Sequence, residues 1–121
     1  MTKKTNYKQY DLEDRTAEFA RNVRRFVKKI KWSIANKEDG KQVVRSSGSV
    51  GANYIEANES LSKKDFIMRI KICRKEAKES RYWLKLIDTR DESAQEKERE
   101  YLVKEATELM NIFGAILSKS T

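Results

Sequence analysis

Hydrophobic residues recur along this chain every three or four positions, which is the spacing that places them on one face of an α-helix. The first stretch with this pattern contains Leu12, Phe19, Val23, Phe26, Val27, Ile30 and Ile34. Asp11 precedes it and is a good N-cap, with Asp14 three residues further on. The pattern therefore predicts a first helix that begins near residue 11 and is followed by a short link at residues 36–40.

The second stretch, residues 42–59, separates into two stripes when it is written on a helix. The first stripe is apolar or small and predicts a face toward the core: Val43, Ser47, Val50, Tyr54 and Ala57. The second stripe is polar: Gln42, Arg45, Ser49, Asn53 and Glu56. Because so many side chains here are short, with Gly48 and Gly51 among them, we expect this helix to lie close against its neighbours.

The third stretch has the most regular pattern in the chain. Ser62 is an N-cap candidate, with Asp65 three residues later as in a capping box. The apolar stripe contains Phe66, Ile70, Cys73, Ala77, Ser80, Leu84 and Ile87. A mixed stripe beside it contains Ile72, Glu76, Glu79, Trp83 and Leu86. A helix with two such stripes has two neighbours, which is typical of a position inside a bundle.

A fourth helix is predicted after a short link at residues 89–91. It opens with acidic residues and becomes apolar at Leu102, Ala106, Leu109, Phe113 and Ile116. Four long helices joined by short links predict an all-α fold, an antiparallel up-down-up-down four-helix bundle. We expect one domain over residues 11–119, preceded by a flexible lead-in at residues 1–10.

Composition supports a helical domain and limits the chemistry. The 121 residues include four glycines, one cysteine, no proline and no histidine. There is no signal-peptide core and no apolar run long enough to cross a membrane. The lone Cys73 fits a reducing compartment, so we expect a cytoplasmic protein.

An enzyme is not expected from these residues. The pairs Glu56/Glu59 and Glu76/Glu79 have a spacing that could hold a metal, but without histidine we expect them to form ion pairs with basic residues instead. Cys73 lies in an apolar stripe with no base to activate it. We therefore expect no catalytic residue, metal, cofactor or small-molecule substrate.

The formal net charge of +8, from 27 Lys and Arg against 19 Asp and Glu, permits contact with nucleic acid. Basic residues concentrate on the first and third predicted helices. The hypothesised nucleic-acid-binding residues are Arg21, Arg24, Arg25, Lys28, Lys29, Lys31, Lys71, Arg74 and Lys78. Tyr82 and Trp83 lie among cations, where aromatic rings can stack on bases. Trp83 is on the inner stripe and favours core packing, and Trp32 is expected to close one end of the bundle.

The polar stripe of the second helix has potential partners on the third. Arg45, Asn53 and Glu56 could meet Glu76 and Glu79 in a hydrogen-bonded layer, because buried charges need partners. Such a layer could stabilise the bundle or form a subunit interface.

Two segments of the chain resemble a known family. The first carries Gln42, Arg45, Ser46, Ser49, Asn53 and Glu56, and the second carries Lys75, Glu76, Ala77, Glu79, Tyr82, Trp83 and Leu84. Together they are similar to the four-helix-bundle family named after proteins encoded in intervening sequences of bacterial 23S ribosomal RNA genes. The resemblance implies a left-handed up-and-down bundle with no enzymatic activity. Gln42, Arg45, Ser49, Asn53, Glu56, Glu76, Glu79 and Trp83 are expected to be structural.

The resemblance also implies a homo-oligomer, since related bundles assemble as basic homopentamers, and a role with nucleic acid. Our first hypothesis is an accessory protein that binds RNA or DNA, with RNA favoured. The alternative is a protein-interaction scaffold without nucleic-acid affinity. In that case the acidic start of the fourth helix would pair with a basic helix of a neighbouring subunit.

Overall fold

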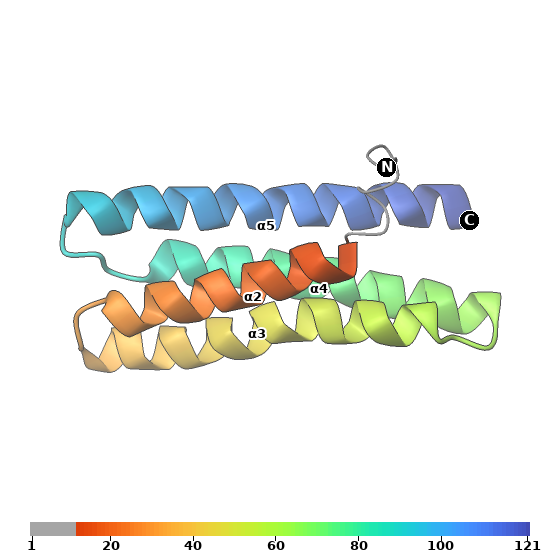
Figure 1. The fold of residues 1–121 in the computed structure, drawn as a ribbon, viewed down its shortest axis with the longest axis horizontal. Coiled ribbons are helices and arrows are strands. Elements are labelled where there is room, and N and C mark those ends of the chain that lie inside the picture. Colours follow the sequence, from red (N-terminus) through yellow and green to blue (C-terminus); the bar gives the residue numbers. More distant parts are fainter. Residues whose placement is uncertain (1–11) are drawn as a thin grey trace, which may run out of the picture.

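The computed structural model describes residues 12–121, and all regular structure in that range is helical. The helices are α2 (Leu12–Lys29), α3 (Ile34–Asn58), α4 (Lys63–Leu86) and α5 (Ser93–Ser120). Figure 1 shows consecutive helices running in alternating directions, from right to left along α2 and α4 and from left to right along α3 and α5. The predicted all-α four-helix fold is confirmed. The handedness of the bundle stays a prediction.

The predicted lead-in at residues 1–10 and the N-cap at Asp11 lie outside the described residues. Each described helix packs against two others: α3 contacts α2 and α4, and α5 contacts α4 and α2. None of these helices contains a segment that is both long enough and apolar enough to span a bilayer.

The predicted link at residues 36–40 is wrong, because α3 already includes those residues. The chain turns at residues 30–33, where Ser33 is extended and its hydroxyl accepts a hydrogen bond from the Asn36 N–H at 3.0 Å. Ile34, which was predicted to extend the apolar face of the first helix, is 73% exposed at the start of α3. The polar first turns of α3 carry little apolar surface, so their sequence resembles a link.

The core predictions for the other helices are confirmed. Ser62 caps α4 by accepting from the Asp65 N–H at 3.0 Å. The buried apolar side chains come from all four helices and from the residue that follows α4: Leu12, Phe19, Val23, Phe26, Val43, Val50, Ala57, Ile70, Cys73, Ala77, Leu84, Ile87, Leu102, Ala106, Leu109 and Phe113. Because α4 buries residues toward both α3 and α5, it occupies the two-neighbour position that its stripes predict.

The contacts that hold α2 against its neighbours include ion pairs with α5 and a close approach to α3. The Arg15 guanidinium pairs with Glu105 at 2.7 Å and with Glu108 at 2.8 Å, both on α5. On the side toward α3, a β-carbon added to Gly40 would lie 3.1 Å from Val27 Cγ1. The close packing expected from the short residues of α3 is therefore present along its contact with α2.

Candidate nucleic-acid interface

Arg45 on α3 reaches two carboxylates on α4, as the two stripes predict. Its Nη2 donates to Glu76 Oε1 at 3.1 Å and lies 3.5 Å from Glu79 Oε1. The Glu76 side chain is only 9% exposed, whereas that of Arg45 is 54% exposed. Arg45 therefore covers a nearly buried carboxylate from the solvent side.

The rest of the predicted polar layer is arranged differently. Asn53 accepts a hydrogen bond from Arg69 Nη1 at 3.0 Å and donates to the Ser49 carbonyl and hydroxyl oxygens. Asn53 and Glu56 therefore do not meet Glu76 or Glu79. Glu56 is exposed and forms no ion pair within residues 12–121.

Two further members of the predicted set lie apart from this contact. Gln42 is exposed on α3 and makes no side-chain hydrogen bond within residues 12–121. Trp83 is half-buried against the core, as its stripe predicts, with its ring 5.0 Å from that of Tyr82.

A buried hydroxyl pair continues the Arg45–Glu76 contact into the core. The Ser80 hydroxyl donates to the Glu76 carbonyl oxygen at 2.9 Å, and Ser46 Oγ lies 2.7 Å from Ser80 Oγ. Ser46 therefore donates to Ser80 between α3 and α4. The sequence places Ser80 in the apolar stripe, but nothing in the pattern identifies Ser46 as its partner.

Many of the cations predicted on α2 are engaged by carboxylates. Arg21 and Arg25 both pair with Glu18, and the hydrogen bond from Arg21 lowers the pKa of the Glu18 carboxyl. Lys29 Nζ lies 2.9 Å from Glu98 Oε1, and Lys31 Nζ lies 3.9 Å from Glu92 Oε2. Acidic residues at and just before the start of α5 thus pair with the basic end of α2 and the loop that follows it, within one chain.

Arg24 and Lys28 are the members of the α2 set that form no ion pair with any residue in the described range. Both are exposed, and the Arg24 guanidinium donates to the Ala20 carbonyl oxygen at 3.1 Å. The positive charge available on α2 is therefore smaller than its sequence indicates.

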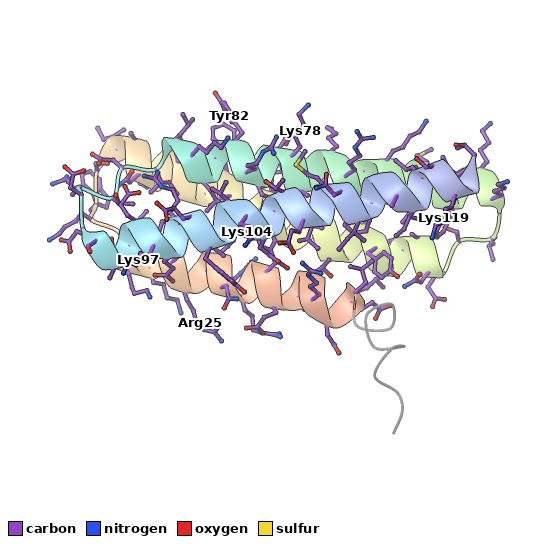
Figure 2. The ribbon with its side chains drawn as sticks, turned by 90° about the horizontal axis from the view of Figure 1, so that it is seen from above. Arg25, Lys78, Tyr82, Lys97, Lys104 and Lys119 are labelled. Carbon is purple, nitrogen blue, oxygen red and sulfur yellow. The ribbon has the colours of Figure 1, made fainter. Side chains whose placement is uncertain are left out.

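The cations on the outer side of α4 remain available. We call them the α4 basic face: Lys71, Arg74, Lys75, Lys78 and Lys85. All are exposed, and within residues 12–121 none forms an ion pair. At about 100° per residue, all five positions fall within an arc of about 100° on the helix, along about 21 Å of its length. Tyr82, 57% exposed, lies among them, and Figure 2 shows Lys78 and Tyr82 on the outer edge of α4.

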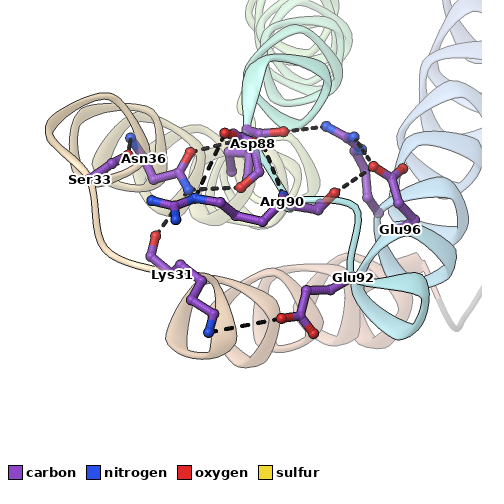
Figure 3. Close-up of polar contacts among 10 residues, drawn as sticks. Lys31, Ser33, Asn36, Asp88, Arg90, Glu92 and Glu96 are labelled. Atoms are coloured by element: carbon purple, nitrogen blue, oxygen red, sulfur yellow. Dashed lines mark hydrogen bonds and ion pairs between the residues drawn. The ribbon is translucent and has the colours of Figure 1, made fainter.

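At one end of the bundle, the α2–α3 and α4–α5 loops are joined by Asn36. Its amide donates to the Lys31 carbonyl oxygen at 3.0 Å and to the Asp88 carbonyl oxygen at 2.9 Å (Figure 3). Sequence reasoning missed Asn36 because it placed this residue in a link. The only available signal was its position three residues after Ser33.

Neither a metal centre nor an activated nucleophile is visible in the described part of the chain. No group of three or more carboxylate and thiol residues comes together there. Burial raises the pKa of the Cys73 thiol to about 12, so the thiol stays protonated at neutral pH.

Comparison with known proteins identifies the family. The family described as "23S rRNA-intervening sequence protein" matches residues 8–115. This chain belongs to that family. A crystal structure of a protein with unknown function from the S23 ribosomal protein family, from Bacteroides thetaiotaomicron VPI-5482, is 34% identical to it. The similarity covers 87% of this chain and 96% of that one, with a TM-score of 0.71. Among curated proteins there is no match to this chain.

Proposed function

We propose that this member of the family is a non-enzymatic, homo-oligomeric cytoplasmic protein that binds RNA. The α4 basic face carries this proposal. Its five cations are exposed on one side of a rigid helix, and no acidic side chain in the described range neutralises them. The two acids within that segment, Glu76 and Glu79, are turned toward Arg45.

Such a face suits a phosphate backbone. Lysine and arginine side chains that neutralise phosphates release condensed counterions, so affinity falls steeply as salt increases. Tyr82 adds an exposed aromatic ring on which a base can stack. Such stacking needs unpaired bases, which the loops and bulges of RNA provide, and we therefore favour RNA over DNA as the ligand.

Exposed apolar side chains support the homo-oligomeric part of the proposal. Ile55, Leu61 and Met68 are each at least 49% exposed. Burial of such residues between subunits is favourable. A pentamer is the assembly that the related bundles suggest.

Fluorescence anisotropy with a labelled RNA hairpin and a labelled DNA duplex, over a series of salt concentrations, tests the proposal. A triple variant, Lys71→Gln, Lys75→Gln and Lys78→Gln, should bind more weakly. Its slope of log affinity against log salt should become shallower by about 2 to 3, the loss of three phosphate contacts. The matched control replaces Lys97, Lys104 and Lys119 on α5 with glutamine (Figure 2). It removes the same charge and should change the slope little.

A scaffold without nucleic-acid affinity is the second candidate, and the same exposed apolar residues favour it. Glu92 and Glu98 already pair with Lys31 and Lys29 of their own chain, so apolar contacts would dominate its assembly. Light scattering should then give a mass that does not decrease with salt. No binding of either nucleic acid by the wild type at low salt would overturn the proposed function and leave the scaffold.

A further inference from the structure

A hollow between the end of α2 and the start of α3 has an apolar floor and a basic rim. Its volume is about 660 Å³, within the range of roughly 300–1,000 Å³ usual for small-molecule sites. We call it the Trp32 hollow. The lining residues used in the argument are Val27, Ile30, Trp32 and Val44 on the apolar side and Lys28, Lys37 and Lys41 on the rim.

Trp32 is the most unusual of these residues. The residue is 71% exposed, although a large aromatic ring is favourably buried. Its loop is nevertheless fixed, because Asn36 binds the carbonyl oxygen of Lys31 and Ser33 caps α3. An aromatic ring in an ordered loop loses little conformational freedom when a ligand covers it.

The floor of the hollow is also fixed. A β-carbon at Gly40 would lie 3.1 Å from Val27 Cγ1, so the glycine allows α2 and α3 to approach closely beneath the hollow. Val27 and Ile30 pack against the core on their other side. The hollow is therefore a preformed surface.

The charge of the rim defines the ligand. Lys28, Lys37 and Lys41 are exposed, and in the described range they form no ion pair. Lys31, which follows α2 and also lines the hollow, lies 3.9 Å from Glu92, a longer distance than any ion pair of α2 itself. None of the described lining residues is acidic. The ligand should therefore combine a flat apolar group with negative charge, as a nucleotide does.

We propose that the Trp32 hollow binds an unpaired nucleotide of the RNA. The base stacks on the Trp32 indole, and the flanking phosphates contact Lys28, Lys37 and Lys41. The inference rests on the proposed function and extends it, because the α4 basic face would bind any phosphate backbone. A base must be unstacked to enter the hollow, so this site confers a preference for single-stranded segments.

The test compares an oligoadenylate of about 12 nucleotides, within the usual site sizes, with a blunt RNA duplex of the same length. Fluorescence anisotropy is measured for the wild type, Trp32→Ala and Trp32→Phe. The control is Tyr101→Ala, which removes an exposed aromatic ring on α5. Trp32→Ala should weaken oligoadenylate binding about tenfold and leave duplex binding unchanged. Trp32→Phe should restore most of the affinity, and Tyr101→Ala should bind as the wild type does.

Other results would overturn the inference in distinguishable ways. If Trp32→Ala binds oligoadenylate as tightly as the wild type, the inference fails and the proposed function stands. If the wild type binds no nucleic acid, the proposed function fails as well. A loss that Trp32→Phe does not restore would show that the indole does not act by stacking. If polyglutamate displaces oligoadenylate as well as unlabelled RNA does, and Trp32→Ala abolishes this competition, the hollow binds acidic peptides instead.

Discussion

Asn36 and Asp88 exchange two hydrogen bonds, although they are 52 positions apart in the chain. Asn36 Nδ2 donates to the Asp88 carbonyl oxygen, and the Asp88 N–H donates to Asn36 Oδ1, both at 2.9 Å. Asn36 is only 2% exposed, and its amide also binds the Lys31 carbonyl oxygen. One buried side chain thus satisfies backbone groups of both loops beside the Trp32 hollow.

Asn36→Ala should lower the free energy of unfolding by about 1–3 kcal/mol, because backbone groups around a buried position lose their partners. Oligoadenylate binding should weaken too, since the loop that carries Trp32 is no longer fixed. Urea unfolding and anisotropy measure the two effects. Asn111→Ala, at an exposed position on α5, is the control and should change neither quantity. Equal stability of the two variants would contradict the role of Asn36.

Gly51 and Gly48 should respond in opposite ways to alanine. A β-carbon at Gly51 would lie 2.8 Å from Thr16 Oγ1 and 3.2 Å from Thr16 Cβ. Thr16 is buried, so Gly51→Ala forces α2 and α3 apart, at a cost of about 1–3 kcal/mol that exceeds the gain in helix propensity. At Gly48 the nearest atom is the flexible end of Arg24, at 3.3 Å, so Gly48→Ala should raise stability by about 0.5–1 kcal/mol. Thermal unfolding measures the melting temperature of both variants. A shift of both melting temperatures in the same direction would refute this view.

Arg45→Leu should destabilise the bundle by about 1–2 kcal/mol, because it leaves the nearly buried Glu76 carboxylate without its cation. Glu76→Leu removes that carboxylate, so the double variant should lose less stability than the sum of the single variants. Urea unfolding of all four proteins gives the coupling energy. Light scattering shows whether Arg45→Leu also changes the mass of the oligomer. Unaltered mass together with an unaltered melting temperature would count against a structural role for Arg45.

Cys73 should make stability depend on alkaline pH. Burial raises its pKa to about 12 in the folded protein, whereas an exposed thiol titrates near about 8.5. Above about pH 8.5, the Cys73 thiol of the unfolded chain releases a proton that the folded chain retains. Stability therefore decreases as pH rises, by at most about 1.4 kcal/mol per pH unit from this group.

Urea unfolding of the wild type and Cys73→Ala, under reducing conditions at about pH 7.5 and about pH 9.5, isolates this contribution. Lysine and tyrosine titrate in both proteins, so their effect cancels in the comparison. Only the wild type loses stability through the Cys73 thiol, so the difference in the free energy of unfolding between the wild type and Cys73→Ala should shrink at the higher pH. A difference that is the same at both pH values would contradict the prediction.

The regular stripes made most of the bundle predictable. Ile70, Cys73, Ala77 and Leu84 are buried as their spacing indicates, because burial of one face is the main force that fixes a helix in water. Prediction failed at the start of α3, where Ile34 is exposed and polar residues follow. There the Ser33 cap and the Asn36 contacts fix the helix, and neither leaves a hydrophobic period in the sequence.

The candidate site was only partly predictable for a related reason. Sequence alone determined that the chain is helical, rich in cations and divided into four amphipathic stretches, since these properties depend on residue type and local spacing. Only the tertiary structure decided which charges are neutralised. Lys29 meets Glu98, 69 positions away, while Lys78 faces solvent, and no local pattern encodes such a distant pairing. The same packing placed Trp32 beside Lys28 and Lys41 around one hollow, because two helices and the loop between them had to come together to form it.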